Sequence, residues 1–596
     1  MGFFKSFFAS LLAIFVTFFL LFLFVLILVV SSKKEPEPYV RNGTILEIKM
    51  GASLPERRPD DPFSILFSDP SRTPVTLRGL ENNLKKAAAD DRIEGIRFKV
   101  NNLSGSWNNL IALRNEILRF REETGKTVYF TTDDVGFNER SYFLATAADS
   151  IFSPPETFFQ MDGFFLQTMF IHEFLENIGV EATVLRAGDF KSAVEPLFRS
   201  DLSEENREQL QAIVDNVAHI FFSAVSERSG LSREELDDII NNDPVITSRQ
   251  AAELGLIDDL LYPDQIEERI KAWLSEQDFD DLRTISYGRY SRVSPESAGV
   301  ERNRSDDKIA LIYANGDIMP EVLDSSPFSS STPTITANGM ARNIKAALED
   351  DDVKAIVVRI NSPGGSGSTS DLIWHNIREA AKEKPVIASM GSVAASGGYY
   401  IAMAADTIVA SQHTITGSIG VFGVTMNLQE LLNNKLGIYF DEVTSHEGSL
   451  WLSPDKPLSP TAEQTLQQFI DDFYDIFLDR VSVSRDMSVE DVHQVAQGRV
   501  WTGNDAQTNG LVDVIGELDT ALDIAAEKAG IEDYRLEVFP KPKSFMELLS
   551  GSAQTQIRYM RTPGLKELKQ LDPLFLILHH DPRTPLARIP FDHIVH

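Results

Sequence analysis

Residues 339–356 read GMARNIKAALEDDDVKAI and repeat, about 260 positions further along the chain, the segment GLENNLKKAAADDRIEGI at residues 79–96. A second pair of segments, AAELGLID at 251–258 and AQTNGLVD at 506–513, recurs with nearly the same offset. Internal repetition over so long a period indicates two successive domains of one fold. It also allows a comparison inside the molecule, because a chemical feature of one copy can be looked for in the other.

The repeat divides the 596 residues into four parts. Each copy is long enough to bury a substantial hydrophobic core. The expected divisions are an N-terminal membrane anchor at 1–34, a first repeat at 41–290, a second repeat at 305–540, and a C-terminal extension at 541–596 that matches neither copy.

In each copy, short β-branched runs alternate with stretches of helical period. This alternation is typical of βαβ units, so we predict a mixed α/β fold with a largely parallel sheet. Long amphipathic helices at 204–228 and 462–484 are expected either to cover the core or to pack between subunits. In the second copy the pattern predicts strands at 353–360, 385–390 and 407–410, and helices at 369–383 and 396–405.

The composition excludes several classes of function. A formal net charge of −32 argues against a nucleic-acid-binding protein, which needs a basic face. The same charge disfavours electrostatic docking on anionic lipid. Cysteine is absent, so the chain has neither disulfides nor thiol chemistry.

The N-terminus carries an uncharged apolar segment at residues 7–30. As a helix it would reach about 36 Å, enough to cross a hydrocarbon core of about 30 Å. A cleavable signal peptide is the alternative, but its apolar region is only about 7–15 residues long, so a retained membrane anchor is expected. Lys5 on one side and Lys33 and Lys34 on the other leave the orientation open.

A glycine turn in the second copy is a candidate oxyanion hole. The sequence INSPGGS at 360–366 ends a predicted strand and places Gly364 and Gly365 before the next helix. Glycine permits the close backbone approach and the φ values that let N–H groups point at a reacting oxygen. The alternative is a plain turn between a strand and a helix.

Ser396 is the candidate nucleophile. It follows a predicted strand, is flanked only by small residues in AASGG, and is expected to present an exposed Oγ at a helix entrance. An N-capping serine in a tight turn is the alternative. Ala148-Asp149 of the first copy aligns with Ala405-Asp406, which places Glu139 opposite Ser396. The first copy therefore folds without this small-residue site.

A serine hydroxyl needs a base before it can attack. His413 lies nearby in the sequence, and no G-x-S-x-G pattern supports a hydrolase triad. The other possibility is a lysine that burial has made neutral, since its pKa must fall from about 10.4 to roughly 7–8. The sequence alone does not identify which lysine would act as this base.

Three motifs together resemble the signal peptide peptidase A (SppA, protease IV) family, in its long tandem-domain bacterial form: NSPGGS at 361–366, ASGGYY at 395–400 and TGSIGV at 416–421. The resemblance covers both copies and implies two tandem ClpP/crotonase-like domains built from βαβ superhelical units. It implies Ser396 as nucleophile, Lys191 in GDFKSAVEP as general base, Ser418 as the residue that orients the lysine, and Gly397 with Gly364 or Gly365 as oxyanion donors.

The resemblance further implies a membrane-anchored serine endopeptidase with a Ser-Lys dyad that degrades remnant signal peptides and other apolar peptides. It implies a single-pass protein of the cell inner membrane, with periplasmic catalytic domains and a homotetrameric assembly. No cofactor, metal or nucleic acid is expected. Within the dyad, the Nζ–Oγ separation is expected to be about 2.6–3.2 Å, in one chain or across a subunit boundary.

Two other functions remain possible on the same fold. A crotonase-type acyl-CoA enzyme would share the backbone oxyanion hole, but it accounts poorly for the apolar N-terminus and for the small residues around Ser396. A non-catalytic membrane scaffold would not need the motifs of the second copy. Walker A and H-E-x-x-H patterns are absent, so ATP-driven or zinc-dependent proteolysis has no support.

Overall fold

The computed structural model describes residues 7, 13–21, 37–51, 53–57, 74–133, 135–277, 279, 281–301, 303–321, 334–541 and 586–588. Residues 13–21 are helical. Within these ranges no helix is both long and apolar enough to cross a membrane. Most of the anchor expected at 7–30 and most of the extension after residue 541 lie outside the described residues.

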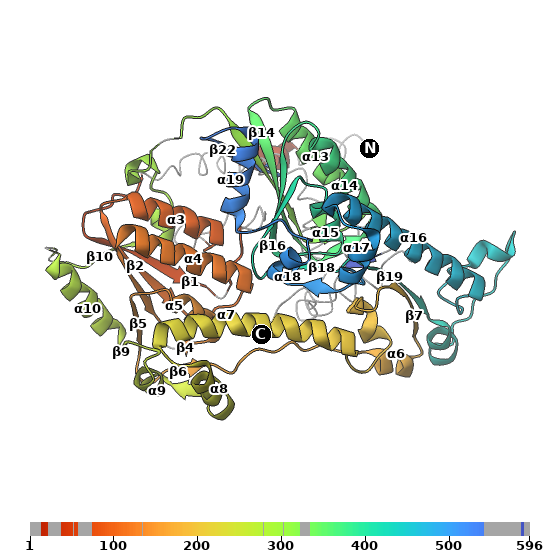
Figure 1. The fold of residues 1–596 in the computed structure, drawn as a ribbon, viewed down its shortest axis with the longest axis horizontal. Coiled ribbons are helices and arrows are strands. Elements are labelled where there is room, and N and C mark those ends of the chain that lie inside the picture. Colours follow the sequence, from red (N-terminus) through yellow and green to blue (C-terminus); the bar gives the residue numbers. More distant parts are fainter. Residues whose placement is uncertain are drawn as a thin grey trace.

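The first repeat contains a six-stranded parallel sheet (Figure 1). One face is covered by α3 (Leu77–Ala89), α4 (Trp107–Thr124) and α5 (Glu139–Ala145), and the other by α10 (Pro263–Glu276). The strand order is β10 (Arg283–Ser286), β1 (Thr44–Met50), β2 (Ile93–Val100), β3 (Thr127–Thr131), β5 (Ser150–Ser153) and β9 (Asp259–Leu260).

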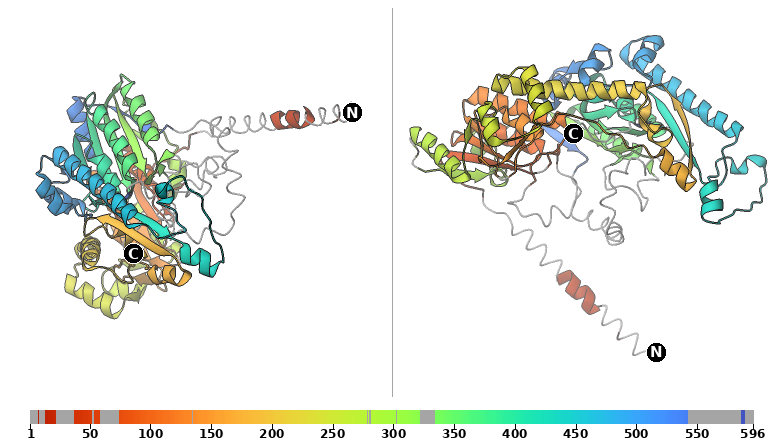
Figure 2. Two further views of the ribbon diagram at one scale, coloured as in Figure 1. Left: turned by 90° about the vertical axis from the view of Figure 1, so that its right-hand side faces the viewer. Right: turned by 90° about the horizontal axis from the view of Figure 1, so that it is seen from below.

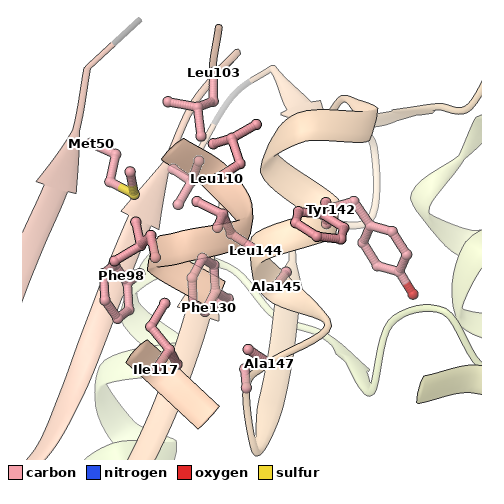
Figure 3. Packing of buried hydrophobic residues seen from close by; sticks show 14 of the residues in the cluster. Met50, Phe98, Leu103, Leu110, Ile117, Phe130, Tyr142, Leu144, Ala145 and Ala147 are labelled. Carbon is pink, nitrogen blue, oxygen red and sulfur yellow. The ribbon is translucent and has the colours of Figure 1, made fainter. Parts of the chain in front are cut away.

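Apolar side chains on successive strands build the core under α4. Phe98 on β2 and Phe130 on β3 stack with their ring centroids 4.6 Å apart, and Leu110 and Ile117 of α4 pack over them (Figure 3). Stacked rings and interlocked aliphatic groups remove a large apolar area from water, which is the main favourable term in folding.

The second repeat contains an eight-stranded sheet, parallel except at β20. Helices α13 (Ala337–Leu348), α14 (Gly367–Ala380) and α15 (Gly397–Ala402) cover one face and α19 (Leu518–Ala529) the other. The main path is β20 (Val500–Trp501), β18 (Ile415–Gly417), β16 (Val386–Ala395), β14 (Val353–Ser362), β11 (Lys308–Asn315) and β22 (Arg535–Phe539), and β17 (Thr407–Ala410) joins β16 to β21 (Val514–Ile515). The predicted mixed α/β class is confirmed.

The two copies share individual hydrogen bonds as well as topology. Tyr142 Oη donates to the carbonyl oxygen of Leu256 at 2.8 Å, and Tyr399 Oη donates to that of Leu511 at 2.9 Å. In each copy one lysine also binds three carbonyl oxygens at a helix end: Lys126 those of Ala87, Ala88 and Asp90, and Lys384 those of Ala347, Leu348 and Asp350.

A third sheet joins the repeats. Strand β7 (Glu181–Ala187) comes from the first copy, yet it pairs antiparallel with β19 (Val421–Asn427) of the second along its whole length. The order continues through β23 (Leu586–Arg588), β15 (Gly364–Ser366) and β12 (Asp317–Ile318) to β13 (Thr334–Ile335). A piece of the first copy is therefore built into the surface of the second, with β7 far from the sheet of its own copy (Figure 1).

Two long helices lie late in the repeats. Helix α7 (Glu204–Ser229) runs beneath both copies from below the first sheet toward β7 (Figures 1 and 2), and α16 (Pro460–Arg485) packs on the second copy. Both bury an apolar face in the core of a repeat, which favours the core-covering interpretation for this chain.

The repeats also pack directly on each other. Val393 and Val500 of the second copy belong to the hydrophobic core of the first. Arg359 Nε forms a buried ion pair with Glu56 Oε1 at 2.9 Å, across the same interface. Apolar packing and a buried ion pair therefore join the two copies directly.

Candidate active site

Ser396 sits at a sharp turn between a strand and a helix. Strand β16 ends at Ala395 and α15 begins at Gly397, with φ +56° and ψ −115° at the serine between them. Positive φ is uncommon for a residue with a side chain, and such strain is typical of functional positions. The Ser396 side chain makes no capping bond to α15, so the N-cap alternative is not supported. The turn forms without a G-x-S-x-G pattern.

The pairing of β16 with β18 places Ser418 beside Ser396. Ala395 and Gly417 are register partners, and the N–H of Ser396 donates to the carbonyl oxygen of Gly417 at 2.8 Å. Ser418 follows β18 with φ +52°, so the chain turns just after both strands. The two hydroxyl groups therefore lie side by side at the carboxyl ends of neighbouring strands.

Lys191 belongs to the first copy and follows strand β7. The pairing of β7 with β19 brings it to the second copy. Ala187 pairs with Val421, so the chain just beyond Ala187 lies close to the residues just before Val421. The turn that follows is held by the second copy, since the N–H of Phe190 donates to the carbonyl oxygen of Gln497 at 2.9 Å. The first repeat thus supplies the lysine, and the second repeat supplies both serines of the same site.

The Lys191 amine has three polar neighbours. Its Nζ lies 2.7 Å from Ser396 Oγ, 3.0 Å from Ser418 Oγ and 3.1 Å from the carbonyl oxygen of Ser418. The Nζ–Oγ separation falls within the expected range, and both residues belong to one chain.

Burial favours the neutral form of this amine. Lys191 is only 1% exposed, and desolvation holds its pKa well below the usual 10.5. Among the described residues no carboxylate forms an ion pair with it. A neutral amine has two N–H donors and one lone pair. With both N–H groups directed at Ser418, the lone pair faces the Ser396 hydroxyl, which is the arrangement that a general base needs.

The candidate oxyanion glycines have backbone conformations that few other residues adopt. Gly364 has φ +107° and Gly365 φ +150°. A methyl group on Gly364 would lie 2.9 Å from the nitrogen of Gly397, and one on Gly365 would lie 2.1 Å from the carbonyl oxygen of Ile318. The N–H of Gly364 donates to Ser362 Oγ at 3.2 Å. The backbones of Gly364 and Gly397 therefore meet beside Ser396 where side chains would not fit, while Gly365 lies against Ile318.

His413 has a different partner from Ser396. Its Nδ1 lies 2.7 Å from Asn216 Oδ1 on α7, and burial lowers its pKa to about 4. The site therefore brings Lys191, rather than His413, to the serine.

The first copy has a carboxyl group where the second has its serine. The matching hydrogen bonds of Tyr142 and Tyr399 support the alignment of Glu139 with Ser396. Glu139 Oε1 accepts from the N–H of Asp162 at 2.7 Å, and desolvation raises the pKa of its carboxyl to about 7. This position in the first copy is thus a buried structural contact.

Sequence reasoning missed the loop that supports the lysine. The N–H of Gly498 donates to the carbonyl oxygen of Ile419 at 2.7 Å, and the N–H of Ser418 donates to that of Arg499 at 2.6 Å. Gly498 has φ +79°, and a methyl group there would lie 2.7 Å from the Cα of Lys191. The sequence offers only an isolated glycine at this place, since its neighbour is about 300 positions away.

Gly498→Ala is expected to lower kcat about 100-fold or more, because an added methyl group must displace the Lys191 backbone by a fraction of an ångström to an ångström. Steady-state hydrolysis of a peptide measures the effect. Gly230→Ala is the matched control, since Gly230 has φ +77° and nothing within 4 Å of the added carbon. Equal kcat values for the two variants would contradict the role given to Gly498.

One expectation is wrong: Ser396 is fully buried, where an exposed Oγ was predicted. Residues 586–588, far away in the sequence, run over the neighbouring glycines as strand β23. The carbonyl oxygen of Ala587 would lie 3.1 Å from a methyl group on Gly397. The sequence predicts nothing for this segment, because a three-residue pairing has no periodicity to detect.

Sequence comparisons with known proteins agree with a peptidase. The sequence model of Peptidase family S49 matches residues 121–277 and again residues 378–532. The chain is 35% identical over 534 residues to "Serine protease SPPA, chloroplastic" from Arabidopsis thaliana, covering 88% of this chain and 76% of that protein. It is 32% identical over 505 residues to "Protease 4" from Salmonella typhi, covering 83% and 78%. Among solved structures, a ClpP1 mutant from Listeria monocytogenes matches with a TM-score of 0.24 and 15% identity, over 36% of this chain and 94% of that one.

Proposed function

The chain belongs to peptidase family S49 and is a serine protease, and from this premise we propose that Ser396 is its nucleophile and Lys191 its general base. The resemblance found in the three motifs is thereby confirmed at the level of the family. The contact that carries the proposal is the one between Lys191 Nζ and Ser396 Oγ at 2.7 Å, made by an amine whose neutral form burial favours.

In the first step the lone pair of Lys191 takes the proton of Ser396 as Oγ attacks the peptide carbonyl carbon. The N–H of Gly397, with that of Gly364 or Gly365, binds the oxygen that becomes negative. Ser418 accepts hydrogen bonds from the amine at its carbonyl oxygen and at Oγ. These two bonds keep the lone pair of Lys191 directed at the Ser396 hydroxyl. A backbone donor fixed at a helix start, such as the N–H of Gly397, needs little reorganisation when the charge develops, whereas the N–H of Gly364 must first leave Ser362 Oγ.

In the second step the protonated Lys191 gives its proton to the leaving amine, and an acyl-enzyme ester remains on Ser396. Water then attacks this ester, with Lys191 again as the base, and regenerates the free hydroxyl. Above the lowered pKa of Lys191, the ammonium form is populated mainly within the cycle. A dry pocket makes that form costly, so the proton is passed on quickly to the leaving group.

Apolar substrates suit the surroundings of the dyad. Val194 and Leu197, just after the lysine, pack in one cluster with Phe422 and Val424 of β19. We take the substrates to be apolar peptides, remnant signal peptides among them. The uncharged segment 7–30 supports a membrane anchor. We take the membrane to be the inner membrane and the catalytic domains to be periplasmic, as the family resemblance implies.

An exposed apolar loop could form an interface in the homotetramer that the family resemblance implies. The loop 436–443 exposes large apolar side chains at positions where a monomer usually has polar ones: Leu436, Ile438, Tyr439, Phe440 and Val443. Neither an acyl-CoA enzyme nor an inactive scaffold is favoured by any contact at the site.

The substrate class is tested with two synthetic peptides of equal length, one with the composition of a signal-sequence core and one rich in Ser, Gln and Asn. The full chain in detergent is expected to cleave the apolar peptide with a kcat/KM at least about tenfold higher, since burying two or three extra apolar side chains stabilises the complex by a few kcal/mol. Equal or faster cleavage of the polar peptide would contradict an apolar substrate class.

A further inference from the structure

One buried amide on α7, the helix that runs beneath both copies (Figure 1), binds each of them. Gln209 belongs to the first copy and is only 2% exposed. Its Nε2 donates to the carbonyl oxygen of Phe190 at 3.2 Å and to Ser192 Oγ at 2.9 Å. Its Oε1 accepts from the N–H of Val500, in the second copy, at 3.1 Å. The two ends of one side chain therefore join the two repeats.

The bonds of Gln209 within the first copy go to the two residues that flank the general base. Phe190 precedes Lys191 and Ser192 follows it. The N–H of Phe190 is bound by the carbonyl oxygen of Gln497, and the carbonyl oxygen of Phe190 is bound by Gln209. The peptide groups on both sides of Phe190 are thus held from outside the turn. A shift of either support would move the lysine that follows.

The bond of Gln209 to the second copy goes to the strand beside Ser418. Val500 lies in β20, which pairs antiparallel with β18, and β18 ends just before Ser418. The N–H of Ser418 donates to the carbonyl oxygen of Arg499, the residue before Val500, at 2.6 Å. Gln209 therefore fixes the turn that carries the amine against the strand that supports its acceptor.

Charged groups beside this amide bind partners of their own. Asn206 Oδ1 also accepts from the amide, at 3.1 Å, and Asn206 Nδ2 donates to the buried carboxylate of Glu195 at 2.8 Å. Arg499 Nη2 forms an ion pair with Glu208 Oε1 at 2.8 Å. A neutral amide in this position binds the turn without adding a charge that would favour the ammonium form of Lys191.

We propose that Gln209 is a positioning residue of the peptidase, whose amide holds the turn 190–192 where the Lys191 amine is buried and directed at Ser396. The inference rests on the dyad proposed above. The hydrogen bonds of Gln209 go to Phe190 and Ser192 rather than to the reacting atoms, so it acts through the lysine. Its loss should therefore slow the chemical step and change the protonation of Lys191, with little effect on substrate binding.

The test is the pH dependence of kcat/KM for an apolar peptide, measured on the full chain with Gln209→Met, which keeps the side-chain length. We expect kcat to fall about 10- to 100-fold, with KM changed less than about threefold. The pH at which kcat/KM levels off should rise by about half a unit or more, because a loosened turn admits water and returns the pKa of Lys191 toward 10.5. Partial unfolding would lower the rate at every pH and leave that levelling-off point in place.

Gln209→Glu is the second variant. Its carboxylate still accepts from the N–H of Val500 but has no N–H for Phe190, and its negative charge favours the ammonium form of Lys191. The levelling-off pH should rise at least as far as in Gln209→Met. Gln211→Met is the matched control on the same helix, since Gln211 is exposed and donates to Asp215 Oδ1 at 2.8 Å. It should keep both kcat and the pH profile.

The two failures differ. If neither Gln209 variant moves the pH profile, whatever its rate, the positioning role is overturned, and an inactive Lys191→Met in the same assay shows that the dyad stands. Normal turnover in Lys191→Met would overturn the dyad, and the inference with it. An equal shift of the profile in Gln211→Met would mean that any glutamine lost from α7 has this effect, and would also overturn the role given to Gln209.

Discussion

Lys191→Met is expected to lower kcat for peptide hydrolysis by about 10⁴-fold, since it removes the general base and keeps the volume of the side chain. The two hydroxyl groups of Ser418 and Ser396 would then face a thioether that neither accepts a proton well nor donates. Single-turnover hydrolysis of an apolar peptide measures the loss in the chemical step directly.

The same change is expected to leave the enzyme folded. The amine of Lys191 binds its proton more weakly in the folded chain than in the unfolded one, so the unfolded state holds more protons between the folded pKa and 10.5. Wild-type stability therefore rises with pH across that window. The melting temperature of Lys191→Met should match or exceed that of the wild type at neutral pH, and this difference should shrink as the pH approaches 10.5.

Lys384→Met is the matched control. Its amine is also partly desolvated, with a lowered pKa, but it binds three carbonyl oxygens at the end of α13. This variant should lose stability and keep its kcat, which is the opposite pattern. A large loss of kcat in Lys384→Met, or normal turnover in Lys191→Met, would contradict the role of Lys191.

Ser396→Ala is expected to lower kcat by about 10⁶-fold, the loss typical of removing the nucleophile from a catalytic unit. The double variant with Lys191→Met should be no slower than Ser396→Ala alone, because residues that act together are not additive. Peptide hydrolysis by the three variants measures the coupling.

Ser392→Ala serves as the control on the same strand, since Ser392 Oγ donates to Ser106 Oγ across the interface of the repeats at 2.7 Å. It should turn over normally. If the fold reductions in kcat of the two single variants instead multiplied in the double variant, Ser396 and Lys191 would not act as one catalytic unit.

The sequence predicted the architecture better than the site. In the second copy, the alternation of strands and helices predicted β14 and β17 close to their observed bounds. The amphipathic pattern did the same for α16. Strand β16 runs to Ala395, well past the predicted end at 390, because Val393 and its neighbours pair with β18 and the N–H of Val393 donates to Asn361 Oδ1. A turn-like sequence beginning at Gly391 gave no sign of this continuation.

The site depends on long-range contacts that no local pattern encodes. The small residues around Ser396 indicated a candidate nucleophile, and the two glycines at 364–365 indicated a candidate oxyanion hole. Lys191 could be chosen only by resemblance, since its place results from the ladder of β7 with β19. Gly498 and Ala587 were missed for the same reason. The domain limits at 41–290 and 305–540 and the ClpP/crotonase-like superhelix stay predictions.

The pH dependence of kcat/KM tests most directly whether the resting enzyme holds Lys191 uncharged, because this ratio reports the ionisation of the free enzyme. With a substrate that does not titrate in the range, kcat/KM should rise with pH as one proton leaves and then level off well below pH 10.5, where burial places the pKa of Lys191. A ratio that kept rising tenfold per pH unit toward pH 10.5 would mean that the amine has its ordinary pKa, and would contradict the mechanism.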